Sequence, residues 1–90
     1  MEKQAAVVVS GQVQGVNFRY YTRKQALILG VTGYAKNLSD GNVEVMCQGE
    51  EGAIKDLMAW LKSGPEAAHV QNIEVEWQEL GNKLYGFDIL

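Results

Sequence analysis

Only two segments of this 90-residue chain have the periodicity of an amphipathic helix, and strand-like segments surround them. The helical segments are residues 18–29 and 50–62. The second one places Ile54, Leu57 and Leu61 on one stripe, at the i, i+3 and i+7 spacing of a helix that packs on a core. Two helices are too few to cover both faces of a sheet with four or five strands, so we expect both to pack on one face.

The strand-like segments predict the sheet beneath these helices. The first is an apolar, β-branched run without alternation, which is typical of a central, buried strand. The second and third flank the pair Asp40-Gly41, a strong signal for a β-hairpin. We expect strands at residues 5–10, 32–38, 43–48, 70–77 and 84–90.

The resulting order is βαββαβ with one additional terminal strand. In a single domain spanning residues 1–90, this order predicts a ferredoxin-like α/β sandwich of the α+β class, with two helices on one face of a mainly antiparallel sheet. Tyr85, Phe87 and Ile89 alternate in the last segment, so we expect it to form a strand throughout.

The chain contains a single cysteine, Cys47, and a single histidine, His69. An internal disulfide, a cysteine-based metal site and a multi-histidine metal site are therefore excluded. Cys47 alternates with valines and is expected in the core, whereas His69 is expected at the surface or at a sheet edge. The apolar run near the N-terminus is too short for a signal peptide or a membrane span, so we expect a soluble, cytoplasmic protein without membrane contact.

The charges are distributed unevenly. The net charge of −3 argues against a nucleic-acid-binding protein. Residues 1–40 nevertheless carry five cations and two acids, whereas residues 41–90 carry three cations and nine acids. A concentration of cations in one half of an acidic chain favours a small, locally bound anion over a long polyanion.

The first helical segment contains Arg19, Arg23 and Lys24 and no acid. The N-terminal turn of a helix has unpaired N–H groups and a partial positive charge, and it therefore favours acidic side chains. The second helical segment follows that rule, since it begins at Glu50-Glu51 and ends at Lys62. The contrast predicts that an external anion, such as a phosphate, takes the place of the missing acid in the first helix.

The loop before the first helix has the composition of an anion site. Residues 11–19 read GQVQGVNFR and lead from the central strand into the helix. Gly15 permits a positive φ angle, Asn17 tolerates the left-handed region, and the planar guanidinium of Arg19 matches two oxygens of a phosphate. The loop lacks the Lys-Ser/Thr pair of a nucleotide-binding loop. Taken alone, it is equally consistent with a tight turn followed by a surface arginine.

Asn37 is a second unusual residue, because asparagine is depleted in strands and Asn37 lies late in the segment 32–38. A side chain of this kind can hydrogen-bond its own backbone in the turn that follows. Without further information, a turn residue and a functional residue remain alternatives.

Two long segments together resemble a known family. Residues 9–19, VSGQVQGVNFR, and residues 33–49, GYAKNLSDGNVEVMCQG, are similar to the two signature segments of the acylphosphatases. The similarity continues through the second helix, Gly64-Pro65 and the terminal Phe87-Asp88-Ile89, and thus covers nearly the whole chain. At Asn17, bacterial members of this family often have glycine.

The resemblance implies hydrolysis of acyl phosphates to a carboxylate and inorganic phosphate, without metal or other cofactor. Arg19 would bind the phosphoryl group and Asn37 would hold the attacking water. The loop would contribute the backbone N–H groups of Gln14, Gly15, Val16, Asn17, Phe18 and Arg19. Inorganic phosphate or sulfate would compete for this site. The expected partner is a small-molecule acyl phosphate, and the expected state is a monomer.

Two other functions are compatible with parts of this sequence. A non-catalytic module that senses phosphate or another anion would need the loop and Arg19 but no water-holding residue, so the presence of Asn37 counts against it. An RNA-recognition domain shares the βαββαβ order, but its central strands would carry outward aromatic residues, which AAVVV and VEVMCQ lack. Tyr20 and Tyr21 are candidates for the edge of the substrate pocket, while Trp60 and Trp77 are expected to be packing residues.

Overall fold

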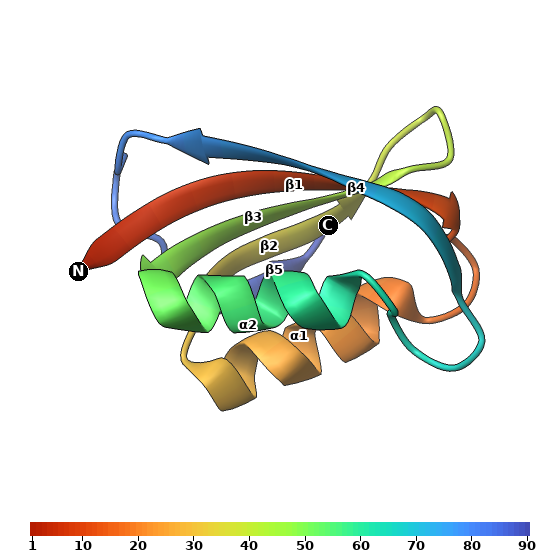
Figure 1. The fold of residues 1–90 in the computed structure, drawn as a ribbon, viewed down its shortest axis with the longest axis horizontal. Helices are drawn as coiled ribbons and strands as arrows, with labels where there is room; N and C mark the ends of the chain where they lie inside the picture. Colours follow the sequence, from red (N-terminus) through yellow and green to blue (C-terminus); the bar gives the residue numbers. More distant parts are fainter.

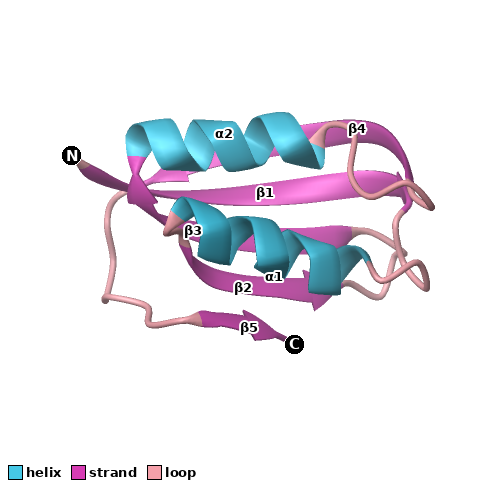
Figure 2. Ribbon diagram, turned by 90° about the horizontal axis from the view of Figure 1, so that it is seen from below, coloured by secondary structure: helices cyan, strands magenta, loops and turns pink.

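The computed structural model describes residues 1–90 and contains five strands and two helices in the expected order. Both helices lie on one face of the sheet, as predicted (Figures 1 and 2). Neither helix is long and apolar enough to cross a membrane. The elements are β1 (Glu2–Gln12), α1 (Phe18–Leu29), β2 (Thr32–Asn37), β3 (Val43–Glu50), α2 (Glu51–Leu61), β4 (His69–Gln78) and β5 (Phe87–Ile89).

The sheet has the strand order β4-β1-β3-β2-β5. β1 pairs antiparallel with β3 and β4, and β2 pairs antiparallel with β3. β5 is parallel to β2, so the sheet is mixed. The position of β1 between two neighbours confirms the central, buried strand expected from its apolar run.

The core lies between the sheet and the two helices. Ala5, Val7 and Val9 of β1 are completely buried on the face toward the helices. Phe18 of α1 and Leu57 of α2 are also fully buried, because the 3.6-residue period of each helix points one stripe at the sheet. Further core residues are Val43, Val45, Cys47, Ile54 and Leu61.

The expected hairpin is present between β2 and β3. Asn37 pairs with Val43, and the N–H of Leu38 donates a 2.8 Å hydrogen bond to the carbonyl oxygen of Asn42. Asp40 accepts a 3.0 Å hydrogen bond from the N–H of Asn42, and Gly41 has a φ angle of 93°. The Asp-Gly pair therefore forms the turn, and β2 ends one residue earlier than expected.

The last segment differs from the prediction of a strand over residues 84–90. Only Phe87–Ile89 pairs with β2, and Tyr85 is 78% exposed. Gly86 interrupts the extended chain with a φ angle of 66°, and its carbonyl oxygen accepts a 3.0 Å hydrogen bond from the N–H of Gly33. The alternation of Tyr85, Phe87 and Ile89 predicts too long a strand, because it does not reveal that Gly86 bends the backbone.

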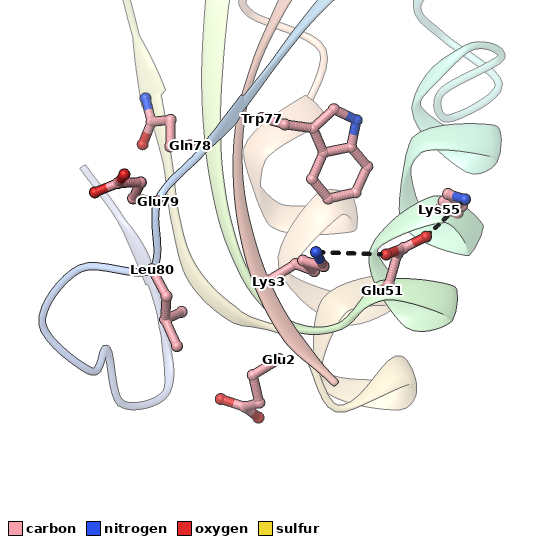
Figure 3. A pocket seen from close by; sticks show the side chains of 8 residues that line it. All are labelled: Glu2, Lys3, Glu51, Lys55, Trp77, Gln78, Glu79 and Leu80. Carbon is pink, nitrogen blue, oxygen red and sulfur yellow. Dashed lines mark ion pairs between the residues drawn. The ribbon is translucent and has the colours of Figure 1, made fainter.

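The two tryptophans also differ from each other. Trp60 packs against the core, 6.0 Å between ring centroids from Phe18, as expected for a packing residue. Trp77 lies on the edge strand β4 and is 44% exposed, so its prediction as a packing residue is wrong. Its ring borders a surface hollow beside Lys3, Glu51 and Lys55 (Figure 3).

Candidate active site

The chain leaves the central strand β1 through a short loop, residues 13–17, and enters α1. Gly15 has a φ angle of 76°, and Asn17, at the N-cap of α1, has a φ angle of 60° in the left-handed region. Both conformations agree with the residue types noted in the sequence. The side chain of Asn17 makes no capping hydrogen bond. Asn17 therefore shapes the loop through its left-handed backbone conformation and not through a capping side chain.

The N–H groups of this segment have no acceptor within the protein. No residue from Gln14 to Arg19 donates a backbone hydrogen bond to a carbonyl or side-chain oxygen. For Phe18 and Arg19 the cause is their position in the first turn of α1, where no preceding carbonyl is available. For residues 14–17 the cause is the curved loop. Successive N–H groups in such a loop form a concave donor surface suited to an anion.

Arg19 lies in the first turn of α1, which contains no acidic residue. The ion pairs of the structure are formed by Met1, Lys3 and Lys55 with Glu50 and Glu51, and Arg19 takes part in none of them. Nη1 of its guanidinium donates a 2.7 Å hydrogen bond to the carbonyl oxygen of Leu90. This bond holds the side chain in place, and no Asp or Glu side chain pairs with the guanidinium.

Asn37 is the last residue of β2. Its Oδ1 atom is buried and accepts no hydrogen bond. The turn interactions that the sequence allowed for Asn37 are made by Asp40 instead. A buried polar atom without a partner costs about 1–3 kcal/mol, so Oδ1 of Asn37 is an acceptor that the protein itself leaves available to a ligand or water.

A cavity of about 300 Å³ brings these residues together. Gly15 and Asn17 enter it from the loop, Arg19 and Tyr20 from α1, and Asn37 from β2. Gln14 and Val16, whose N–H groups were predicted to contribute, belong to the same loop but do not line the cavity. Its remaining lining residues are Val13, Phe18 and Ile89.

Two features of the site were not anticipated from the sequence. The side-chain amide of Gln14 donates hydrogen bonds of 2.8 Å to the carbonyl of Leu38 and 2.9 Å to the carbonyl of Asn42. It thereby ties the loop to the hairpin beside Asn37. The second feature is the contact of Arg19 with Leu90, which depends on β5 lying next to β2. Neither has a local sequence signal, because each joins segments that are distant along the chain.

The other reactive residues lie outside the cavity. Burial raises the pKa of the Cys47 thiol to about 12, so it is not a thiolate at neutral pH. His69 is exposed at the start of the edge strand β4, as expected. No three His, Cys, Asp or Glu side chains are grouped in a way that could hold a metal ion.

A second hollow lies at the opposite end of β1, beside Trp77 and the N-terminus of α2 (Figure 3). Lys3 and Lys55 reach into it, but both pair with Glu51, at 4.0 Å and 2.9 Å. Both lysines thus share a carboxylate partner within the protein. By contrast, Arg19 pairs with no Asp or Glu side chain, and the loop N–H groups near it have no acceptor within the protein.

Known proteins are similar to this chain in sequence and fold over nearly its whole length. The family profile described as Acylphosphatase matches residues 5–89. An acylphosphatase of Pelotomaculum thermopropionicum is 50% identical over 86 residues, which is 96% of this chain and 94% of that protein. An acylphosphatase structure from Coxiella burnetii has a TM-score of 0.93 and 42% identity, covering 99% of this chain and 93% of the other. That from Bacillus subtilis has a TM-score of 0.94 and 32% identity, covering 100% and 99%. The chain belongs to the acylphosphatase family, the enzymes that hydrolyse the carboxyl-phosphate bond of acyl phosphates.

Proposed function

We propose that hydrolysis takes place in the cavity between the 13–17 loop and β2, with Arg19 and the loop N–H groups on the phosphoryl group and Asn37 on the attacking water. The observation that carries this assignment is the unpartnered Oδ1 atom of Asn37 in the same cavity as Gly15 and Arg19. Donors for an anion and an acceptor for water thus meet at one place.

The phosphoryl group is the part of the substrate that the loop can stabilise. Phosphoryl transfer spreads negative charge over three equatorial oxygens, and catalysis consists mainly of positioning and of stabilising that charge. The N–H groups of residues 14–19 and the guanidinium of Arg19 offer fixed donors for these oxygens. Loss of a single donor of this type costs on the order of 10²–10³ in rate.

The leaving group needs no proton from the protein. A carboxylic acid has a pKa of roughly 4–5, so the carboxylate departs as an anion at neutral pH. This agrees with the residues that line the cavity, none of which is an Asp, Glu or His. The site therefore has a donor surface for the phosphate and no general acid.

Asn37 orients the water. Oδ1 accepts a hydrogen bond from the water, which directs an oxygen lone pair toward phosphorus. The water forms the new P–O bond, the P–O bond to the carboxylate breaks with its electron pair, and the water's proton passes to a phosphoryl oxygen of the substrate. A protein base is not required for this step.

The same argument supports metal independence. Arg19 and the loop supply the positive charge that a metal ion contributes in other phosphoryl-transfer enzymes. Inorganic phosphate, as product, and sulfate, as its analogue, compete for the same donors. The monomeric state and the cytoplasmic location stay predictions.

The test is the hydrolysis of benzoyl phosphate in EDTA by the parent and by the folded variants Arg19→Lys and Asn37→Ala. We expect rapid turnover by the parent and a loss of on the order of 10²–10³ in kcat/KM for each variant. Arg19→Lys keeps the positive charge but loses the planar guanidinium, so it tests whether two-point binding of the phosphoryl oxygens is required.

Phosphate binding provides the matching control. Phosphate is expected to raise the Tm of the parent and of Asn37→Ala, because both retain the donor loop, and not that of an Arg19→Ala variant. Chelator-sensitive activity would contradict metal independence. Stabilisation by phosphate without any turnover would support an anion-sensing module instead.

A further inference from the structure

We propose that a groove beside the phosphate cavity binds the acyl group of the substrate and selects uncharged, apolar acyl groups. This rests on the proposed function, which defines where the phosphoryl group lies. The groove has a volume of about 750 Å³, within the range of small-molecule sites. It lies where the start of α1 faces the end of α2 (Figure 2). Its lining residues are Val16, Asn17, Tyr21, Gln25, Trp60, Pro65, Glu66 and Ala67.

The groove is a neighbour of the phosphate cavity. Asn17 lines both hollows. Tyr20 lines the cavity and Tyr21 lines the groove, and their rings touch edge to face with centroids 5.2 Å apart. A ligand that extends from the cavity across the first turn of α1 therefore meets the groove next.

The geometry of the reaction points the acyl group in this direction. In an in-line displacement, the attacking water and the leaving carboxylate lie on opposite sides of phosphorus. Asn37, which holds the water, is at the end of β2. The groove residues 65–67 lead into β4, and β1 and β3 separate β4 from β2 in the sheet. The groove thus lies toward the β4 edge of the sheet and Asn37 toward the opposite edge, and Asn37 does not line the groove.

The lining of the groove is suited to an apolar group. Trp60 is held by its contact with Phe18, so its ring forms a fixed wall. Tyr21 is 41% exposed and forms the rim, and Pro65 adds a rigid apolar surface. Contact with such rings stabilises the binding of flat apolar and aromatic groups.

The charge of the groove further limits which acyl groups it can bind. Its only charged side chain is Glu66, and no lysine or arginine lines it. A carboxylate on the acyl group would meet this negative charge without a compensating cation. The structure therefore favours benzoyl-like and aliphatic acyl phosphates over phosphates of sugar acids or dicarboxylic acids, a choice that the sequence had left open.

Binding of two analogues that cannot be hydrolysed tests the groove. Phenacylphosphonate and acetonylphosphonate both replace the bridging oxygen by a methylene group and differ only in the phenyl or methyl end. By calorimetry, we expect the parent to bind phenacylphosphonate about tenfold more tightly. Tyr21→Ala is expected to remove most of this preference, because the rim is lost. Tyr85→Ala, which removes an exposed tyrosine that lines neither hollow, is the matched control.

The possible results separate the groove from the phosphate site. Equal affinity of the parent for both analogues, or an equal weakening of both by Tyr21→Ala, would overturn the groove while leaving the phosphate site in place. Failure of the parent to bind either analogue would overturn the phosphate site and the groove together. A preference for phenacylphosphonate that Tyr21→Ala abolishes and Tyr85→Ala retains would establish the acyl subsite, whatever the rate of turnover.

Discussion

The N-termini of α1 and α2 satisfy the same physical requirement in opposite ways. α2 begins after Glu50 in the extended conformation and has Glu51 in its first turn. Glu51 accepts from Lys55 at 2.9 Å and lies 4.0 Å from Lys3. α1 begins after Asn17 in the left-handed conformation and has no acid in its first turn. Instead it carries Arg19.

The difference separates a helix end that is complemented within the chain from one that is not. At α2, a side chain of the same chain complements the partial positive charge of the helix. At α1, unpaired N–H groups and a cation lie together, an arrangement that is unfavourable without an anion. Under the proposed function, the protein accepts lower stability at the start of α1 in exchange for an anion site there. The hollow beside the N-terminus of α2 is the contrasting case, because its lysines already pair with Glu51 (Figure 3).

Exchange of one cation at each helix is the strongest test of this contrast. Arg19→Met and Lys55→Met both remove a positive charge and keep an apolar stem. We expect the first to lower kcat/KM for benzoyl phosphate by on the order of 10³, because a donor to the equatorial oxygens is lost. The second is expected to leave kcat/KM unchanged, and steady-state kinetics measure both. A similar loss in the two variants would mean that net charge, rather than position, determines activity.

The two N-cap conformations predict different tolerance to a β-branched residue. Asn17→Val forces valine into the left-handed region and is expected to lower the free energy of unfolding by about 1–3 kcal/mol. Glu50→Val places the same residue in an extended conformation, φ −61°, and is expected to cost much less. Urea denaturation measures both values. Asn17→Gly is the favourable exchange, and a large loss of stability on this change would show that the Asn17 side chain matters beyond its backbone.

An acid can be added to the first turn of α1 to make it resemble α2. Tyr20→Glu is expected to stabilise the fold by about 0.3–1 kcal/mol through the helix dipole. The same carboxylate lies at the phosphate cavity, so kcat/KM is expected to fall about tenfold or more by repulsion of the substrate. Tyr20→Gln controls for loss of the ring. Thermal unfolding and kinetics should change in opposite directions; a parallel change would argue against an anion site here.

The ion pair of α2 predicts a small pH effect. The hydrogen bond from Lys55, followed by its charge, lowers the pKa of Glu51 below its ordinary value of 4.5. A carboxyl group with a lowered folded-state pKa stabilises the fold above its ordinary pKa, and this contribution disappears as the pH falls through the folded-state value. Glu51→Gln should therefore lower Tm slightly at pH 7, and this difference should shrink as the pH is lowered below 4.5. An unchanged difference over this pH range would show that the pair does not contribute through charge.

The sequence predicted most of the secondary structure because the relevant signals are local. The helix at Phe18–Leu29 ends at Gly30 with a φ angle of 75°, as a glycine C-cap requires. The hairpin at Asp40-Gly41 and the buried stripe of α2 follow from similarly short patterns. The failures, at residues 84–90 and at Trp77, occur at the sheet edges. Burial there depends on which strand is the neighbour, and alternation along one segment does not carry that information.

The site divides in the same way between local pattern and tertiary contact. Short sequence patterns predicted three features: the glycine loop, the start of α1 without an acid, and Asn37 as an unusual strand residue. They could do so because propensity and helix electrostatics act over a few residues. The hydrogen bond from Arg19 to Leu90 spans 71 positions, and the bonds from Gln14 to Leu38 and Asn42 span 24 and 28. The groove between α1 and α2 is equally non-local. Such contacts arise when strand order and helix packing bring separate elements together, and the spacing of residues along the chain does not encode them.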